Sequence, residues 1–352
     1  MPHSTVARPG TPEIPPPFPD SLPRAPIQRI SLQHLIDRDP AAEKDLWDAC
    51  TSHGFFYLDC TSCDLGRSIV RAADELEKLS HPAFRLPTEV KQSAAMSRMR
   101  SLFGYKGPGN VAQDDPHKRR DVGEFWNISK DDVLGQSENP VPYPSILQEA
   151  HPLFEDFMRN AHRVGLLVME LLAGRLGIPP EQLLSKHKLQ GKSGDHVRLT
   201  FGPGDPEEAE REATRAEAET KITTYAHTDF GSVTLLFNWL GGLQIENRAS
   251  GVWEWVKPVP GHAICNLGDA MYEFAGGKVS SGKHRVVAAP GAQAAYDRYS
   301  VVYFVRPEDN VVLEDLTPGA VPKPEGQRWT AGKWIDERSR QLGNKIKERT
   351  DA

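Results

Sequence analysis

A histidine and an aspartate lie two residues apart in the middle of a segment that otherwise predicts a β-strand. The segment is TTYAHTDFGSVTLLF (residues 223–237), and the pair is His227 and Asp229. Side chains at positions i and i+2 of an extended chain point to the same side, so Thr223, Tyr225, His227 and Asp229 are expected to share one face. The imidazole and the carboxylate are two candidate metal ligands, whereas an isolated His-x-Asp pair is more often a turn or surface feature.

A metal site needs a third ligand, and the best candidate is His284. Of the twelve histidines, only His227 is followed two positions later by a carboxylate, and His284 is the one later histidine in a predicted strand, GKHRVVAA. Two histidines and one carboxylate occupy one face of an octahedral ion and leave three positions open, as in non-haem Fe(II) oxygenases. The same ligands could hold catalytic zinc, so the three residues leave oxygenase and hydrolase chemistry open.

A possible anion site follows the third ligand. In the stretch DRYSVVYFV, alternation puts Arg298, Ser300 and Phe304 on one side of a predicted strand whose two sides are both largely apolar. Arg298 is therefore predicted to be partly buried, and a buried guanidinium needs an anion. Its fork suits a carboxylate, with the Ser300 hydroxyl beside it. The alternatives are that Arg298 pairs with Asp297 or faces water.

The second half of the chain predicts many short strands. Apolar residues there recur with period two or in short runs, separated by Gly and Pro, which is typical of a sandwich or jelly roll. The predicted strands are HVRLTF, KITTYA, SVTLLF, GLQIE, VWEWV, AICNL, HRVVAA and RYSVVYFV. A long helix is predicted before them, from Pro152 to Leu176, because apolar residues recur there at helical spacing and Gly177 ends the pattern.

Together, His227-x-Asp229, His284 and Arg298-x-Ser300 resemble the isopenicillin N synthase-like branch of the Fe(II)/2-oxoglutarate-dependent dioxygenases. The resemblance extends in family order over nearly the whole chain after its first residues. Its further motifs are ACTSHGFFYL, FRLPTEVK, FGYKGPG, HTDFGSVTLLF and CNLGDAMYEFAGGKVSSGKHRVV. It implies an α+β fold, mainly β, with a double-stranded β-helix (jelly roll) core flanked by helices.

The resemblance also implies the roles of the site residues. His227, Asp229 and His284 would bind Fe(II). Arg298 and Ser300 would bind the far carboxylate of 2-oxoglutarate, and O2 would be the second cosubstrate.

Two segments depart from the family pattern. Many relatives carry a Tyr-Pro pair after an Arg in the strand before the metal motif, whereas this chain has Arg198-Leu-Thr-Phe-Gly202-Pro. A hydroxyl often found near the cosubstrate is therefore missing at Gly202, and Thr200 is the candidate to replace it. The usual Asn-His-Gly after the first strand is replaced by Asp59-Cys-Thr. Neither change affects a metal ligand.

The implied activity is that of an oxidoreductase acting on a C–H bond of a small molecule, by hydroxylation, desaturation, or ring formation or rearrangement. We expect a specialised metabolite or an amino-acid derivative as substrate. Three alternatives remain: an Fe(II) oxidase that does not use 2-oxoglutarate, as isopenicillin N synthase does not, a zinc hydrolase, and a non-catalytic binding domain on the same scaffold. By their positions, the candidate residues of the substrate pocket are Tyr105, Phe125, Asn127, Arg198, Phe304 and Trp334.

Composition argues against other classes of partner. A net charge of −6 over 352 residues argues against nucleic acid, which needs clustered Lys and Arg. The longest apolar run is short and contains Glu170, so no membrane span is expected. Four cysteines without a secretory signal fit a cytoplasmic location, and the Cys60-x-x-Cys63 pair is interpreted as structural. The oligomeric state is left undetermined.

The expected organisation has five parts. They are a disordered Pro-rich leader (1–26), an N-terminal dioxygenase region of helices and strands (27–150), a long helix and connection (151–194), the jelly-roll core (195–310) and a C-terminal helical segment (311–352). Within the core, residues 204–221 carry seven acidic and three basic side chains and no large apolar one. Because such a segment buries little surface, we expect a mobile insertion there.

Overall fold

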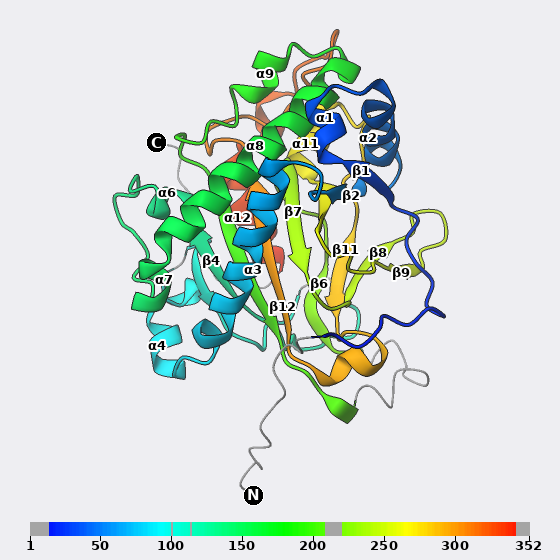
Figure 1. Cartoon of the computed structure of the whole chain (residues 1–352). Coiled ribbons are helices and arrows are strands. Elements are labelled where there is room, and N and C mark those ends of the chain that lie inside the picture. Colours follow the sequence, from blue (N-terminus) through cyan, green and yellow to red (C-terminus); the bar gives the residue numbers. More distant parts are fainter. Residues whose placement is uncertain (1–13, 100, 113–114, 208–219, 343–352) are drawn as a thin grey trace, which may run out of the picture.

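The computed structural model describes residues 14–99, 101–112, 115–207 and 220–342. Within these residues the strands form two sheets (Figure 1). The larger sheet has the order β1-β2-β10-β7-β12-β5-β4-β3, and the smaller one β6-β11-β8-β9. The site described below lies between them.

Eight consecutive strands make the jelly-roll core. Their bounds are β5 His196–Gly202, β6 Ile222–His227, β7 Val233–Asn238, β8 Leu243–Glu246, β9 Trp253–Trp255, β10 His262–Leu267, β11 His284–Val287 and β12 Arg298–Val305. Along the chain, β5, β7, β10 and β12 join the larger sheet, whereas β6, β8, β9 and β11 form the smaller one. All pairs among them are antiparallel. The predicted fold class and all eight predicted strands are confirmed.

Four N-terminal strands widen the larger sheet. β1 (Gln28–Ser31) and β2 (Phe55–Asp59) extend one edge, and β3 (Gly104–Lys106) and β4 (Glu124–Ser129) the other. β2 is the first strand expected before Asp59-Cys-Thr, and β3 falls in the family motif FGYKGPG. β3 has only three residues, so pairing with β4, rather than its own composition, makes it a strand.

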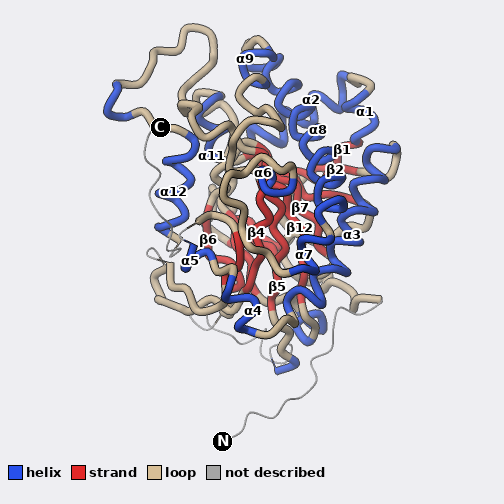
Figure 2. Tube along the Cα trace, turned by 90° about the vertical axis from the view of Figure 1, so that its left-hand side faces the viewer, coloured by secondary structure: helices blue, strands red, loops and turns tan. Residues whose placement is uncertain are grey.

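Two long helices cover the outer face of the larger sheet. They are α3 (Asp64–Phe84) and α8 (His151–Leu176), which pack against each other and lie on one side of the strands (Figure 2). α8 is the predicted long helix, and it ends at Gly177 with φ of 71°. The helix approaches the sheet closely at Gly165, where a Cβ would lie 2.6 Å from Val305 Cγ2. With this face covered, the opposite face is left for the site.

The remaining helices are shorter. They are α1 Leu32–Ile36, α2 Pro40–Ser52, α4 Thr88–Ser93, α5 Met96–Met99, α6 Lys130–Val133, α7 Ser145–Glu149, α9 Pro180–Leu184, α11 Asp269–Phe274 and α12 Ala331–Gln341, with 3-10 turns at Gly291–Ala295 and Glu325–Gln327. Helix α12 confirms the predicted C-terminal helix, while residues 343–352 lie outside the described residues. No helix in the described part of the chain has both the length and the apolar character that crossing a membrane requires.

Where the structure describes the expected leader, from residue 14 onward, most of its side chains are exposed but it is anchored to the core at a few points. Phe18 is only 6% exposed and meets the Trp255 ring edge-on at 6.4 Å. Gln293 Nε2 donates to the Pro16 carbonyl (2.8 Å), and Arg24 forms a β-bridge with Trp255. The structure therefore differs from the expectation of disorder over 1–26, because one aromatic side chain anchors a Pro-rich stretch. Residues 1–13 lie outside the described residues.

Residues 208–219, most of the expected mobile insertion, also lie outside the described residues. Its described ends are fixed to the core. The backbone N–H of Gly204 donates to Asp297 Oδ1 (3.0 Å), that of Asp205 donates to the Ala294 carbonyl (2.7 Å), and Lys221 pairs with Asp205. Mobility of the insertion stays a prediction.

The four cysteines are buried free thiols. Cys63 caps α3 by accepting a hydrogen bond from the Gly66 N–H (3.3 Å), and burial raises the pKa of Cys60 to about 12. A buried, protonated thiol is a poor nucleophile and metal ligand, which supports the structural interpretation of this pair.

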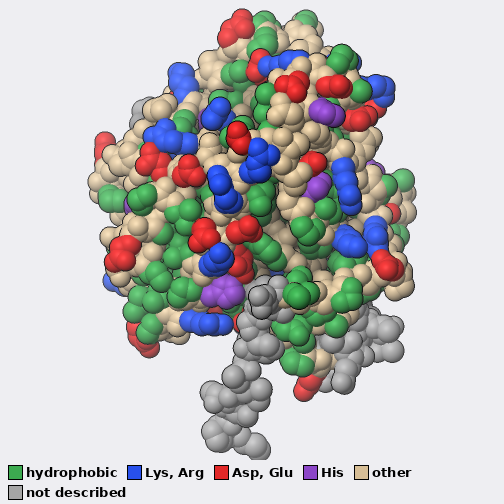
Figure 3. All heavy atoms as spheres, in the orientation of Figure 1, with side chains coloured by type: hydrophobic (Ala, Val, Ile, Leu, Met, Phe, Trp, Pro, Cys, Tyr) green, Lys and Arg blue, Asp and Glu red, His purple; other side chains and the backbone are tan. Residues whose placement is uncertain are grey.

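Charged side chains of both signs are interspersed on the face seen in Figure 3. This mixture fits the expectation that the chain does not bind nucleic acid, which stays a prediction.

Candidate active site

Strands β6 and β11 bring the two candidate histidines together. His227 ends β6 and His284 begins β11, and the two are direct partners in the antiparallel register. Their ring centroids lie 4.4 Å apart. Asp229 follows two residues after β6, where its carbonyl accepts a hydrogen bond from the Asp269 N–H (2.7 Å). The sheet register thus unites residues that are far apart in the sequence.

The donor atoms of these three side chains converge. Asp229 Oδ1 lies 3.5 Å from His227 Nε2 and 3.8 Å from His284 Nε2. One ligand atom from each residue lies within 4.8 Å of the others, and no other group of three His, Cys, Asp or Glu side chains among the described residues does so. The predicted site is therefore assembled in the fold.

Backbone carbonyls fix the tautomer of both imidazoles. Nδ1 of His227 lies 2.7 Å from the Tyr225 carbonyl, and Nδ1 of His284 lies 3.1 Å from the Gly282 carbonyl. A carbonyl oxygen only accepts, so each Nδ1 must carry the proton. Each Nε2 then turns a lone pair toward the shared space, as a metal-binding histidine does.

The carboxylate is oriented in the same way. Asp229 Oδ2 accepts hydrogen bonds from Thr234 Oγ1 and Asn266 Nδ2, both at 2.7 Å, which leaves Oδ1 facing the imidazoles. Burial by itself would raise the pKa of Asp229, but His284, His227 and the bond from Asn266 hold it well below its usual range. Burial, together with His227, lowers the pKa of His284 to about 4. An ionised carboxylate and neutral imidazole are the states that bind a divalent metal.

The sequence analysis did not find Asn266 and Thr234. Each is a buried polar residue inside a predicted strand that is otherwise mainly apolar, AICNL and SVTLLF. A polar residue in an otherwise apolar strand was the feature that could have identified them, since a buried polar side chain needs a hydrogen-bond partner.

Asn266→Ala should weaken Fe(II) binding by about 10- to 100-fold, because Asp229 loses one of the two bonds that orient it. Anaerobic titration with Fe(II) would measure this. Asn160→Ala, which removes an asparagine from the exposed part of α8, is the control and should leave the affinity unchanged. An unchanged affinity in Asn266→Ala would show that this bond does not orient a metal ligand.

A buried cation lines the same cavity as the three candidate ligands. Arg298 is 4% exposed, and its Nε donates to the Gly241 carbonyl (2.6 Å). Its Nη2 is buried and has no hydrogen-bond partner among the described residues. Burial lowers the pKa of Arg298 to about 10, so the side chain remains a cation at neutral pH. An unpaired buried N–H of a cation calls for an anion.

Two hydroxyls accompany this guanidinium. Ser300 pairs with Thr200 across β12 and β5, and their hydroxyls are hydrogen-bonded to each other. Arg298, Ser300 and Thr200 line a cavity whose wall also includes His227, Asp229 and His284. Asp297 instead accepts from the Gly204 N–H, which removes the alternative pairing with Arg298.

The predicted alternation of β12 is confirmed. Arg298, Ser300 and Phe304 all line this cavity. On the other side, Tyr299 stacks on His81 of α3 (4.3 Å).

A second cavity adjoins the first, and His227 and Asp229 line both. Three of the six candidate pocket residues line the second cavity: Phe125, Arg198 and Phe304. The position of the metal ligands between two connected spaces is suited to a cosubstrate on one side and a substrate on the other.

The other three candidates line neither cavity. The Tyr105 hydroxyl is bonded to Glu124, and Trp334 packs around Phe230 and Ile335. Asn127 is fully buried but touches the cavity wall, since its Oδ1 accepts a bond from Arg198 Nε (2.8 Å). Position in the sequence did not reveal these side-chain partners.

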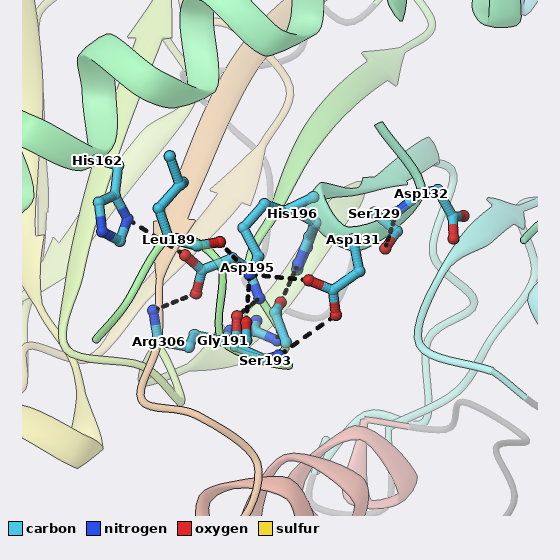
Figure 4. Close-up of polar contacts among 12 residues, drawn as sticks. Ser129, Asp131, Asp132, His162, Leu189, Gly191, Ser193, Asp195, His196 and Arg306 are labelled. Carbon is cyan, nitrogen blue, oxygen red and sulfur yellow. Dashed lines mark hydrogen bonds and ion pairs between the residues drawn. The ribbon is translucent and has the colours of Figure 1, made fainter. Parts of the chain in front are cut away.

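A buried polar cluster supports the strands that form the cavity wall (Figure 4). Asp195, just before β5, accepts from the Arg306 N–H (2.7 Å) and the Tyr303 hydroxyl (3.1 Å), and His162 lies beside it at 3.5 Å. Next to it, the His196 ring packs on Phe304 with centroids 4.6 Å apart. The cluster therefore fixes the start of β5 and the end of β12.

Known proteins are similar along nearly the whole chain. Residues 195–307 match the 2OG-Fe(II) oxygenase superfamily, and residues 26–149 match the family described as non-haem dioxygenase in morphine synthesis N-terminal. The chain is 30% identical over 362 residues to a 2-oxoglutarate-dependent dioxygenase of Aspergillus fumigatus, covering 96% of this chain and 91% of the relative. It is 29% identical to one of Gibberella zeae, covering 82% of each.

Solved structures share the fold. A full-length Neurospora crassa protein in complex with alpha-KG superposes with a TM-score of 0.71 at 23% identity, covering 89% of this chain and 95% of that one. A 2OG-Fe(II) oxygenase family protein of Caulobacter crescentus superposes with a TM-score of 0.68 at 22% identity, covering 90% and 99%.

Proposed function

Because the chain belongs to the 2OG-Fe(II) oxygenase superfamily, we propose that His227, Asp229 and His284 bind its Fe(II). The converging Nε2 and Oδ1 atoms support this assignment, as do the bonds that fix each ligand. We assign the far carboxylate of 2-oxoglutarate to Arg298, with Ser300 and Thr200 beside it. Thr200 then supplies the hydroxyl that Gly202 lacks.

The enzyme is an oxidoreductase that uses Fe(II), 2-oxoglutarate and O2. When bound, Fe(II) with the keto acid and O2 supplies an oxidant for a C–H bond, with succinate as coproduct. The chain contributes positioning and environment. His227 and His284 present their Nε2 atoms, Asp229 presents a fixed carboxylate, and Arg298 neutralises an anion in a poorly solvated cavity.

One observation carries the assignment of the keto acid. Arg298 Nη2 is buried without a partner among the described residues, and it lies in the cavity that holds the three candidate ligands. A zinc hydrolase or a non-catalytic binding domain gives no reason for such a cation beside the triad, and family membership sets both alternatives aside.

The proposed substrate is a small molecule, either a specialised metabolite or an amino-acid derivative. The second cavity combines apolar side chains with polar groups, as small-molecule sites do. Among the solved structures, the Neurospora crassa protein is also known in complex with alpha-KG and thymine.

We also retain the five-part organisation given above as a proposal. The matched ranges 26–149 and 195–307 support the regions 27–150 and 195–310. A cytoplasmic location stays a prediction.

Succinate release tests the proposed function. The Fe(II)-loaded protein, mixed with 2-oxoglutarate and a library of small molecules without oxygen, should release succinate after O2 is added, and a true substrate should raise the rate. The Zn(II)-loaded protein is the control and should release none. Oxidation of a substrate in the absence of 2-oxoglutarate would contradict the proposal. So would a protein that releases no succinate after O2 is added, whether or not a library compound is present.

A further inference from the structure

Arg198 of β5 presents a fixed guanidinium where the two cavities meet, since it lines both of them. Its Cζ lies 4.2 Å from the ring centroid of Phe125 and 5.1 Å from that of Phe304. Its Nε donates to Asn127 Oδ1 (2.8 Å), and Asn127 is itself held by a bond from its Nδ2 to the Leu102 carbonyl (2.7 Å). The two rings and Asn127 thus hold the faces and one edge of the guanidinium. The Nη edge, which makes two parallel bonds to a carboxylate, remains available.

This cation has no ion-pair partner of its own in the described part of the chain. The carboxylate whose negative charge raises the pKa of Arg198 is Asp229, which we assign to the metal. Burial lowers the pKa of Arg198 to about 10, so it remains protonated at neutral pH. A buried cation without a paired anion is costly, and a ligand anion would offset that cost.

The other two basic residues of this cavity are engaged elsewhere. Lys106 pairs with Asp121 and donates to the Gly123 carbonyl (3.0 Å). Arg306 donates to the Gly194 carbonyl (3.2 Å). Among the described residues of this cavity, Arg198 is the one whose guanidinium is fixed by an asparagine and two aromatic rings and has no ion pair.

Arg198 is set apart from Arg298 along the sheet. In the pairing of β5 with β12, Arg298 lies opposite Gly202, whereas Arg198 lies opposite Val302. Four residues of strand correspond to about 13 Å. The Ser300–Thr200 pair lies between the two positions, next to the proposed keto-acid site. The two arginines therefore lie on opposite sides of the Ser300–Thr200 pair, and we assign them different anions.

We propose that the substrate is a carboxylate with an apolar body, and that Arg198 binds its carboxylate. This inference rests on the proposed function, which makes the second cavity the substrate side of the metal. Part of the wall fits an apolar body, since Phe125, Phe230, Phe304 and Leu342 line the same cavity beside polar residues such as Asn110, Thr223 and Ser339. Asn127 is a positioning residue, because it acts through Arg198.

Matched acids and amides test this inference. Benzoate, phenylacetate and cinnamate, each beside its amide, would be titrated by calorimetry into the anaerobic Fe(II)–2-oxoglutarate protein. Acid and amide have nearly the same shape and differ in charge. At least one acid should bind about 30-fold or more tightly than its amide, as expected when a charge-assisted pair in a buried site is lost.

Variants assign the preference to Arg198. Arg198→Met should abolish the difference between acid and amide, and Arg198→Lys should keep part of it because an ammonium cannot form the fork. Arg159→Met, which removes an exposed arginine of α8, is the control and should keep the full difference. Binding of 2-oxoglutarate, followed by the absorption of its Fe(II) complex, should be unchanged in all three variants.

The inference is overturned if none of the acids binds the wild type more tightly than its amide, a result that needs no variant to fold. It is also overturned if Arg198→Met keeps the preference. Failure to bind 2-oxoglutarate or to release succinate would instead contradict the proposed function, so the two failures are distinguishable.

Discussion

Asp229→Ala should abolish turnover and weaken Fe(II) binding by more than about 100-fold, since changes to groups that only support a ligand already cost about 10- to 100-fold. The variant removes the one anionic ligand from a site whose other two ligands are neutral. Asp229→Asn should fail almost as completely, because it keeps the size of the side chain and loses the charge. Anaerobic Fe(II) titration and succinate release would measure both effects.

The fold should survive these substitutions. Asp229 lies after β6, and the apolar cores that hold the sheets together do not include it. Circular dichroism and the midpoint of thermal unfolding of the metal-free proteins would test this. Asp156→Ala, on the exposed part of α8, is the matched control and should keep wild-type activity. An Asp229→Asn protein with normal Fe(II) affinity and turnover would show that the metal lies elsewhere.

Arg298→Ala should lower the apparent affinity for 2-oxoglutarate by some 30- to several-thousand-fold. The substitution leaves the far carboxylate with Ser300 and Thr200 alone in a poorly solvated cavity, and loss of a charge-assisted pair costs about 2–5 kcal/mol. Arg298→Lys should recover only part of the affinity, because an ammonium does not reproduce the two-point contact. Initial rates against keto-acid concentration would give the affinities.

The Fe(II) affinity should barely change in Arg298→Ala, because the three candidate ligands are untouched. This separates loss of the keto acid from collapse of the site. A wild-type enzyme that turns over its substrate without 2-oxoglutarate, together with an Arg298→Ala variant that raises only the substrate KM, would assign Arg298 to a substrate carboxylate. The oxidase alternative of the isopenicillin N synthase kind would then be correct.

The jelly-roll core was predictable because its signals are local. Period-two runs such as RYSVVYFV and the helical spacing before Gly177 specify their elements without reference to the rest of the chain. β3 and the anchored leader were not predictable in this way. β3 is a strand because β4 pairs with it. The segment around Phe18 is anchored because Phe18 packs against Trp255 and the Pro16 carbonyl accepts a hydrogen bond from Gln293.

The same distinction applies to the site. The spacing of His227 and Asp229 and the alternation of Arg298 and Ser300 are local patterns, and the structure brings these residues together. The pairing of His227 with His284 depends on the sheet register, which no short segment specifies. Which residues line the pocket depends on the partners of their side chains, and these partners are not visible in the sequence. Tyr105 and Trp334 therefore line neither cavity, although position in the sequence made them candidates.

The most direct test of the account is anomalous diffraction at the iron edge from anaerobic crystals containing Fe(II) and 2-oxoglutarate. We predict one strong peak at roughly 2.0–2.3 Å from His227 Nε2, Asp229 Oδ1 and His284 Nε2. The far carboxylate of the keto acid should contact Arg298 Nη2. Iron bound at Cys60 and Cys63, or a keto acid whose far carboxylate lies away from Arg298, would contradict the account.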